Sequence, residues 1–322
     1  MLCRTASDLY WVARHMERAE NTARLIDLTQ RIALLPERFE RGKAAAAPWR
    51  RALDALGIAD DYLAKHGTID GDGTLRHLLL APDNPSSVFS CFRAAREAAR
   101  AQRVVITSEM YEDLNSSWLE IRQLDATHLD HGGISRILDR IKNRSASFRG
   151  VTIGTLGRGE GYQFLQLGVF IERADWAIRL LDVVGSHDGA GEADDARDTA
   201  EYFQWSALLQ SLSAFETYRR LGHAAVTPVG VTELMLLSDA SPRSLQTCSQ
   251  SLHQVLRELA RGERLDVVRE AGAAEAHTRY ARIEDILGGG LEPWLQAAMS
   301  RLIGLGNGIH RQFMTSTDVV PA

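Results

Sequence analysis

A twelve-residue stretch that occurs twice constrains the fold of this chain more than any other feature of its sequence. The first copy is Met16–Asp27 and the second is Ile171–Asp182, so each position recurs 155 residues further along the chain. Six of the twelve positions are identical, and two more keep their chemical type. A segment repeated at this distance indicates that the chain contains two related halves.

Both copies have the apolar spacing of an α-helix, with steps of three or four residues. The first apolar seam is Leu9, Val12, Met16, Ala19, Ala23 and Ile26. The second is Phe164, Leu167, Ile171, Ala174, Ile178 and Leu181. Each copy is therefore predicted to be a helix with one buried face.

A charged stripe with the same spacing runs beside each seam. The first stripe is Glu17, Glu20, Arg24 and Asp27, and the second is Glu172, Asp175, Arg179 and Asp182. The ordinary interpretation of one such stripe is a solvated flank with ion pairs within the helix, which are weak. Because the types and their order agree in two copies, we expect the first three groups of each stripe to be largely buried and mutually paired.

Helices are predicted along most of the rest of the chain. The first should cover about 7–35, with a capping box from Thr5 to Asp8. Further helices are predicted at about 49–65, 75–80, 86–115, 118–129 and 135–148, and later at about 270–287 and 291–314. The segments 37–48 and 185–198 are predicted loops, 226–231 a connector, and the glycine-rich segment 150–161 a link between the halves.

Two further segments repeat in the same order. Trp205, Leu209, Leu212 and Tyr218 match Trp49, Leu53, Leu56 and Tyr62, and Pro242, Ser244 and Cys248 match Pro85, Ser87 and Cys91. The period is too long for a solenoid, and no alternating strand pattern is found. We therefore predict an all-α fold, a multi-helix bundle of two pseudo-symmetric, tandemly duplicated halves. The single domain would cover 1–314, with repeats 1–150 and 151–314 and a tail at 315–322.

Composition argues against several classes of protein. The net charge of −5 gives no general attraction to nucleic acid or anionic lipid, so neither is an expected partner. No run of 18 apolar residues and no apolar signal segment is present, so a cytoplasmic location is expected. The three cysteines are too few for a disulfide framework or a zinc site, and Cys91 and Cys248 are predicted to be buried free thiols.

Motifs for metals and cofactors are weak. There is no Glu-x-x-His pair of the di-iron type, and the cluster Asp125, His128, Asp130 and His131 is better explained as a solvated helix end. The segment Gly154–Gly161 has no Lys-Ser/Thr of a phosphate loop and follows no strand. No cofactor and no metal are predicted.

Carboxylates and arginines on helices are the remaining candidates for a site. If helices of the two halves face each other, these groups would line a polar cleft in which opposite charges alternate. The candidate binding residues are Arg14, Glu17, Arg18, Glu20, Arg24, Glu97, Arg100, Glu109, Glu112, Glu172, Arg173, Asp175 and Arg179. Arginine grips carboxylates or phosphates, and glutamate accepts an ammonium group, so an amino acid or peptide would suit the cleft.

Four stretches resemble the bacterial Alpha-E family, an all-helical family named for its recurring glutamates. They are Leu9–Arg24, Asn84–Val88 with Arg96–Arg100, Ile106–Asn115, and Phe164–Gly168 with Glu172–Asp175. The resemblance covers nearly the whole chain. This sequence departs from the family at Ala98, Tyr111 and Val169, where Asn, Trp and Arg are frequent.

The resemblance implies a functional context. Alpha-E proteins are similar to proteins encoded beside, and sometimes fused to, a circularly permuted ATP-grasp protein and a transglutaminase-like protease. Two hypotheses follow. In the first, the chain is a non-catalytic partner of an ATP-grasp peptide or amide ligase. In the second, it is itself an enzyme that uses paired carboxylates and arginines for acid–base chemistry.

Overall fold

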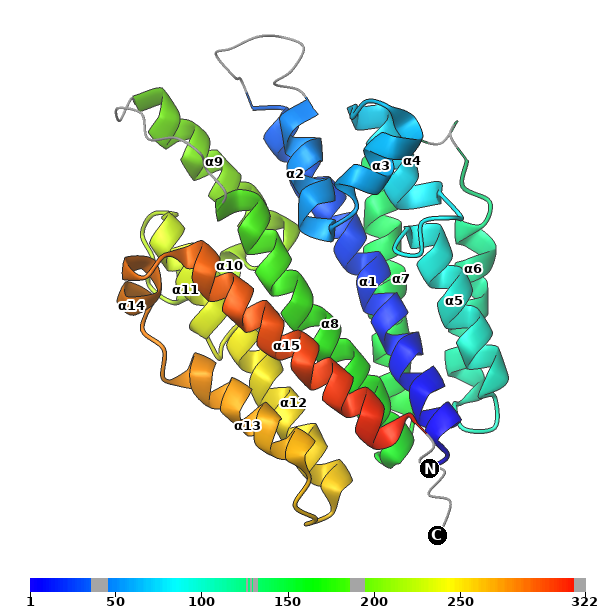
Figure 1. Ribbon diagram of the computed structural model, residues 1–322. Helices are drawn as coiled ribbons and strands as arrows, with labels where there is room; N and C mark the ends of the chain where they lie inside the picture. The colour runs from blue at the N-terminus through cyan, green and yellow to red at the C-terminus, as the bar shows by residue number, and fades with distance from the viewer. Residues whose placement is uncertain (36–45, 126, 128, 130–132, 186–194, 316–322) are drawn as a thin grey trace.

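A computed structural model describes residues 1–35, 46–125, 127, 129, 133–185 and 195–315 of the chain. Within these residues there are fifteen α-helices and no strand (Figure 1). The all-α prediction is therefore confirmed. The predicted tail from 316 onward, most of both predicted loops, and His128, Asp130 and His131 lie outside the described residues.

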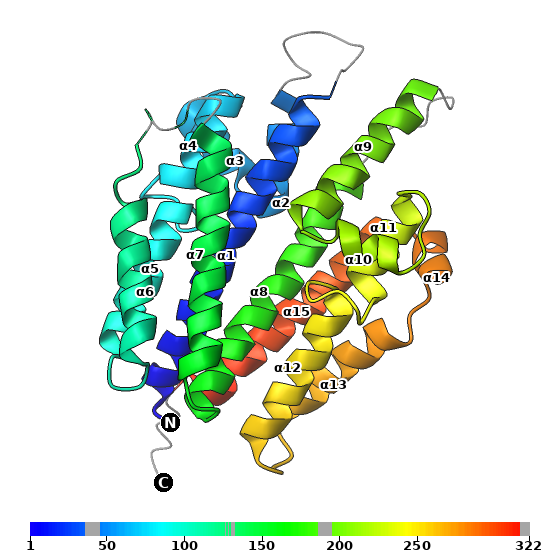
Figure 2. The same cartoon turned by 180° about the vertical axis from the view of Figure 1, so that it is seen from behind.

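Two long helices, α1 (Cys3–Ala33) and α8 (Glu160–Gly185), lie side by side at the centre of the molecule (Figure 1). The helices between them in sequence gather mainly on the α1 side, and the later ones on the α8 side. Figure 2 shows the same division from behind. The two copies of the repeated stretch therefore face each other across the centre of the bundle.

The two central helices have similar surroundings. α1 packs against α5 (Val88–Ala101) and α7 (Gly133–Thr155), and α8 packs against α12 (Leu245–Ala260) and α15 (Leu291–Phe313). α6 (Ser108–Ile121) contacts α5 and α7, as α13 (Asp266–Arg279) contacts α12 and α15. α2 (Ala47–Leu56) reaches across to α8, and α9 (Asp195–Ser211) reaches across to α1.

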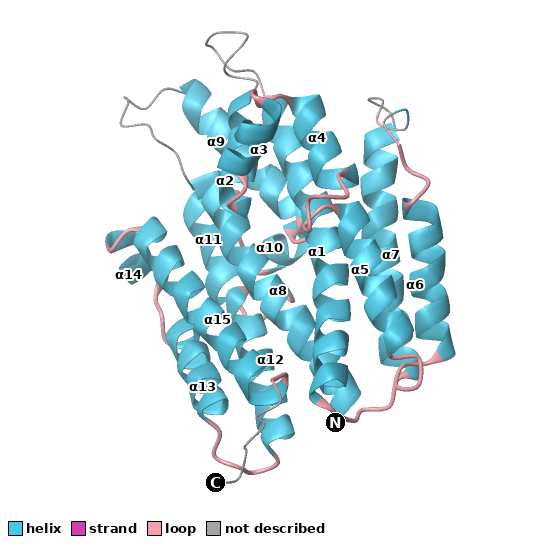
Figure 3. Cartoon of the chain, turned by 45° about the vertical axis from the view of Figure 1, so that its right-hand side comes forward, coloured by secondary structure: helices cyan, strands magenta, loops and turns pink. Residues whose placement is uncertain are grey.

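Five short helices complete the bundle (Figure 3). They are α3 (Ala59–His66), α4 (Gly71–Leu80), α10 (Phe215–Arg220), α11 (Pro228–Leu237) and α14 (Ile283–Gly288). α4 packs against α5, and α11 packs against α12. Because helices surround α1 and α8 on most sides, all twelve residues of the two predicted seams are buried, which confirms that prediction.

A glycine lets the two central helices approach closely. A Cβ atom added at Gly168 would lie 2.3 Å from the Tyr10 carbonyl oxygen and 2.9 Å from the Ala13 Cβ. A side chain of any size would therefore push α1 away from α8 at this point. The close approach is what brings the charged stripes of the two helices within ion-pair distance of each other.

Several local interactions recur about 157 residues apart. Ser87 and Ser244 cap α5 and α12, and each hydroxyl also donates to a carbonyl six residues earlier. The hydroxyl of Tyr62 lies against Gly73, as the hydroxyl of Tyr218 lies against Gly230.

Helix ends differ from the predictions where tertiary contacts override local signals. α1 begins at Cys3, so the expected capping box lies inside the helix, and Asp8 instead accepts a hydrogen bond from Gln102 Nε2 (2.6 Å). The predicted helix at 49–65 is divided at Gly57, which has a φ of 70°. The predicted helix at 86–115 is divided between residues 102 and 107, where Thr107 caps α6.

Other predicted breaks are absent from the described structure. Residues 115–117 lie inside α6, and α7 continues through Gly150 and Gly154 to Thr155, which leaves only a short link before α8. The predicted connector at 226–231 already contains the first turn of α11, with Pro228 at its first position, which suits proline. The predicted helix at 270–287 is divided into α13 and α14.

Candidate functional site

The repeated Glu-Arg pairs bind each other across the two central helices. Arg18 donates from Nε to Glu172 Oε1 (2.7 Å) and from Nη2 to Glu172 Oε2 (3.0 Å). In the opposite direction, Arg173 donates from Nε to Glu17 Oε2 (3.0 Å) and from Nη2 to Glu17 Oε1 (2.8 Å). Both pairs have the bidentate geometry that makes guanidinium–carboxylate bonds strong. Each helix therefore supplies the carboxylate for the other helix's arginine.

Glu172 has further donors around it. Arg14 Nε donates to its Oε2 (2.8 Å) and Trp176 Nε1 donates to its Oε1 (3.2 Å). The glutamate side chain is 1% exposed, whereas Arg14 and Arg18 are each 19% exposed. The arginines thus cover a carboxylate that has no access to solvent.

More arginines surround Glu17 and Glu20, at the other end of the cluster, than surround Glu172. Arg149 of α7 donates from Nη1 to Glu17 Oε1 (2.8 Å) and also to Glu20. Arg243, just before α12, pairs with Glu20 and lies 3.6 Å from Glu17 Oε2. Both glutamate side chains are 1% exposed. Side chains from α1, α7, α8 and the start of α12 therefore meet at two buried carboxylates.

Arg24 and Arg179 each form an ion pair within their own helix and also bind the end of a second helix. Each binds a carboxylate one turn earlier in its own helix, Glu20 and Asp175 respectively. Each also donates to a carbonyl in the last turn of the helix that reaches across, Ser211 in α9 and Ala55 in α2. Carbonyls at a helix end lack partners in the helix, so both arginines act as C-terminal caps.

The expected burial and pairing of the stripes is confirmed in most positions. Glu17, Glu20, Arg24 and Glu172 are buried, with exposed fractions of 8% or less. Asp175 and Arg179 are paired but only half-buried, with side chains 18% and 29% exposed.

Electrostatics fix the charge states of the carboxylates. Burial alone would raise the pKa of Glu172, but Arg18 and Arg14 outweigh it and lower the pKa to about 2. The pKa values of Glu17 and Glu20 are lowered in the same way, against burial, by Arg173, Arg149 and Arg243. All three carboxylates are therefore ionised at neutral pH.

Positive charge is in excess at the Glu17 end. Four guanidiniums surround two carboxylates there: Arg24, Arg149, Arg173 and Arg243 face Glu17 and Glu20. Burial lowers the pKa of Arg243 to about 10, assisted by repulsion from Arg24 and Arg173, although Glu20 and Glu17 pull it upward. The cluster thus retains an unbalanced positive charge.

Four predicted site residues lie outside this cluster. Glu97 and Arg100 pair with each other on the outer face of α5, with side chains 46% and 61% exposed. Glu109 and Glu112 are exposed on α6. α5 packs on α1 through its apolar face, which turns its charges to solvent, and the break after residue 101 redirects α6.

Two members of the cluster, Arg149 and Arg243, were missing from the predicted set. Arg149 adjoins the glycines that were predicted to form a link, and it is half-buried one turn after the buried Ser145. Arg243 stands between Pro242 and the N-cap Ser244, where no helical periodicity exists. A predicted helix that continued past residue 148 would have included Arg149 but would not have placed it in a charged stripe, and no sequence signal pointed to Arg243.

A small cavity adjoins the Glu17 end of the cluster, between α1, α7 and α8. Its volume is about 190 Å³. It is lined by Ala13, Met16, Glu17, Phe148, Arg149, Thr152, Ile153, Leu165, Gln166, Val169, Phe170 and Arg173. The wall is mainly apolar, and the two arginines and Glu17 supply its charges.

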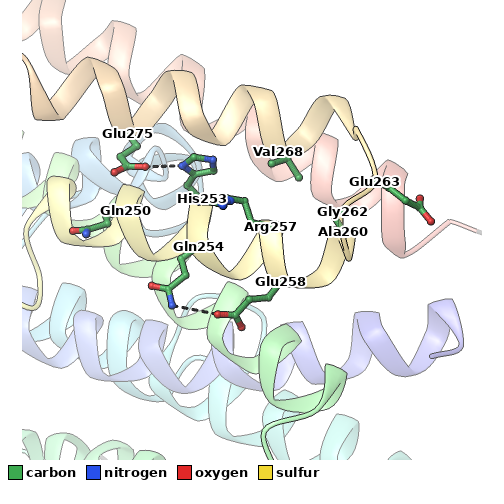
Figure 4. A pocket seen from close by; sticks show the side chains of 10 residues that line it. All are labelled: Gln250, His253, Gln254, Arg257, Glu258, Ala260, Gly262, Glu263, Val268 and Glu275. Atoms are coloured by element: carbon green, nitrogen blue, oxygen red, sulfur yellow. Dashed lines mark hydrogen bonds and ion pairs between the residues drawn. The ribbon is translucent and has the colours of Figure 1, made fainter.

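A larger, open hollow of about 740 Å³ lies between α12 and α13 (Figure 4). Its groups pair among themselves: His253 Nδ1 lies 2.6 Å from Glu275 Oε2, and Gln254 Nε2 donates to Glu258 Oε1 (3.2 Å). Gln254 and Glu258 are exposed, so water screens their interactions. This hollow lacks the buried charge that distinguishes the α1–α8 cluster.

The two predicted buried thiols are confirmed. Cys91 and Cys248 are free and buried, and burial raises the pKa of each thiol to about 12. A thiol with such a pKa is a poor nucleophile at neutral pH. Among the described helices, none is long and apolar enough to cross a membrane.

The stability of the fold should fall in acid because of these carboxylates. The pKa of Glu172 lies below its ordinary value of 4.5, so its pairing stabilises the folded chain fully above about pH 4.5, and this is lost as the pH falls through about 2. The shift corresponds to roughly 3 kcal/mol of unfolding free energy. Urea unfolding at several pH values should show this loss, with a shallower dependence in Glu172→Gln. The exposed control Glu109→Gln should change the free energy at neutral pH by no more than about 0.5 kcal/mol.

Comparison with known proteins gives a family but no activity. The Alpha-E model, described as "a predicted alpha-helical domain with a conserved ER motif", matches residues 1–314. Uncharacterized proteins of Mycobacterium bovis and Mycobacterium tuberculosis are each 25% identical over 345 aligned positions. The match covers 99% of this chain but only 36% of each relative, so those proteins are much longer. No solved structure matches the chain.

Proposed function

The chain belongs to the Alpha-E family, and from that premise we propose that it is a non-catalytic helical partner of an ATP-grasp peptide or amide ligase. In this role the buried cluster between α1 and α8 recognises a charged group of an amino acid or peptide. The partnership would take place in the cytoplasm. A transglutaminase-like protein, the other neighbour implied by the resemblance, would be a second partner.

The observation that carries the binding role is the charge state of the cluster. A general acid or base works best when its pKa is near the working pH. The pKa values of Glu17, Glu20 and Glu172 are lowered by their arginines, and arginine itself stays protonated. His15, beside the cluster, is no better placed, because burial and Arg18 lower its pKa to about 4. Such a cluster holds charge and does not exchange protons near pH 7.

Support for the ligase partner comes from the family context and from the length of the relatives. A domain that makes up 36% of a longer protein works next to other sequence in the same chain. The same helical domain in this chain is therefore suited to work in contact with a catalytic protein. The glutamate–arginine ion pairs weigh against the alternative, an enzyme that acts through acid–base chemistry. Each carboxylate that such an enzyme would use is already held in its charged form by arginine.

The proposal includes an internal duplication of residues 1–150 and 151–314. It is supported by the reciprocal Glu-Arg pairs, by the two arginine caps, and by the matched packing of α5 on α1 and of α12 on α8. In a two-fold arrangement of two equivalent halves, if residue i of the first half contacts residue j of the second, then residue j of the first half contacts residue i of the second. Unequal ends of the cluster then mark where the two copies diverged, as Arg149 and Arg243 serve only one of them.

The purified chain and its cognate ATP-grasp ligase should elute together in gel filtration at moderate salt. ATP consumption by the ligase with candidate amino acids should rise when the chain is added. Arg149→Gln should reduce this gain, while Arg100→Gln, at an exposed pair on α5, should retain it. Amide-bond turnover by the isolated chain, with no ligase and no ATP, would replace the proposal with the enzyme hypothesis.

A further inference from the structure

The cavity between α1, α7 and α8 combines an apolar wall with charged groups at one end. Ala13, Met16, Phe148 and Leu165 on its wall are 1% to 3% exposed. Ile153, by contrast, is 54% exposed and stands at the rim. The cavity is therefore a pocket with a buried floor and an accessible edge. Its size exceeds the apolar cavities of about 150 Å³ that accept benzene in other proteins.

The two arginines on its lining have unused donors. Arg149 uses Nη1 for Glu17, Glu20 and Ser145, and Arg173 uses Nε and Nη2 for Glu17. Within the described part of the chain, no acceptor reaches Nε and Nη2 of Arg149 or Nη1 of Arg173. Their side chains are 22% and 12% exposed, so both arginines are held mostly inside the bundle beside the pocket.

The charge balance beside the pocket favours an anion. The four guanidiniums at this end outnumber the two carboxylates, and a buried charge is costly unless it is paired. The carboxylate of a ligand placed between Arg149 and Arg173 would match the forked arrangement of the N–H donors in both guanidiniums. A bare phosphate would supply the charge but would leave the apolar wall uncovered.

We propose that this pocket binds a carboxylate that carries an apolar side chain of leucine to phenylalanine size. The carboxylate would accept hydrogen bonds from Arg149 and Arg173, and the side chain would lie against Met16, Phe148 and Val169. A hydrophobic amino acid and the C-terminal residue of a hydrophobic peptide share this chemistry. The inference rests on the proposed recognition of a charged group by the cluster, and it names the class of that group.

The test uses isothermal titration calorimetry on the isolated chain, without ligase. N-acetyl-leucine and N-acetyl-phenylalanine should bind with dissociation constants of about 1 mM or tighter. The matching uncharged amides should bind at least about tenfold more weakly, because the charged contact is lost. Free leucine and a short peptide ending in leucine distinguish the two sources: stronger binding of the peptide identifies a peptide C-terminus, and stronger binding of leucine identifies the amino acid.

Variants locate the site. Arg149→Met, which removes donors, and Val169→Trp, which fills the pocket, should each weaken N-acetyl-leucine binding at least about tenfold. Arg257→Met, in the hollow between α12 and α13, is the control and should bind as the unchanged chain does. Equal affinity of the unchanged chain for acid and amide would overturn the inference, even if a variant failed to fold. No binding of any acid would also overturn it, while co-elution with the ligase would still test the proposed partnership separately.

Discussion

Glu17→Ala should destabilise the folded chain by about 3 to 5 kcal/mol, the usual cost of breaking a buried ion pair by removing one partner. Glu17 is 1% exposed and binds Arg149 and Arg173 directly, with Arg243 close by. Its removal leaves these guanidiniums with Glu20 as their only neighbouring carboxylate in the described cluster. The measurement is urea-induced unfolding followed by circular dichroism, with an unchanged dependence on urea showing that the folded state is retained.

The matched control is Glu112→Ala, an exposed glutamate on α6 that the sequence had suggested for the same site. It should change the free energy of unfolding by no more than about 0.5 kcal/mol. A similar loss of unfolding free energy in both variants would mean that the buried ion pairs of Glu17 contribute no more to stability than an exposed glutamate does. A loss below about 1 kcal/mol for Glu17→Ala would mean that its arginines find other partners.

Gly168→Ala should destabilise the chain by about 3 kcal/mol or more, the upper end of what overpacking costs. The new Cβ would lie 2.3 Å from a backbone oxygen, that of Tyr10, and backbone cannot rotate aside as a side chain can. The relief of this clash would move α1 from α8 and lengthen both reciprocal ion pairs. Thermal unfolding followed by circular dichroism would detect the loss.

Gly150→Ala provides the control for glycine replacement as such. Gly150 lies within α7, and a Cβ there would meet no atom within 4 Å. Alanine favours a helix over glycine by about 1 kcal/mol, so this variant should be as stable as the unchanged chain or slightly more stable. If Gly168→Ala behaved like Gly150→Ala, the close approach of α1 and α8 would not be needed for the fold.

Helical periodicity was enough to identify the two central helices and their buried seams. It also located the charged stripes, because two copies of one pattern, at Met16–Asp27 and Ile171–Asp182, agree in type and order. Burial of Glu17 and Glu172 follows from the same pattern only if another helix covers the stripe. The close approach of α1 and α8 at Gly168 provides that cover. A single glycine within a helical sequence is not enough to predict such a close approach.

The remainder of the site depends on contacts that are distant in sequence. Arg149 and Arg243 reach the cluster from α7 and from a turn before α12, and neither position belongs to a periodic stripe. Glu109 has the expected chemistry, but its side chain is exposed, because α6 packs on α5 and α7 through its other face. The break between α5 and α6 contains no glycine or proline, so the local sequence gave no reason to divide that helix.

The central claim is that reciprocal glutamate–arginine pairs join α1 to α8. A double-mutant cycle on Arg18 and Glu172 tests it most directly, with Arg18→Met, Glu172→Leu and the double variant compared by urea unfolding. The pair is bidentate and its carboxylate is 1% exposed, so we expect a coupling energy of at least about 1.5 kcal/mol. A coupling energy below about 0.5 kcal/mol, the level found for independent sites, would contradict the claim.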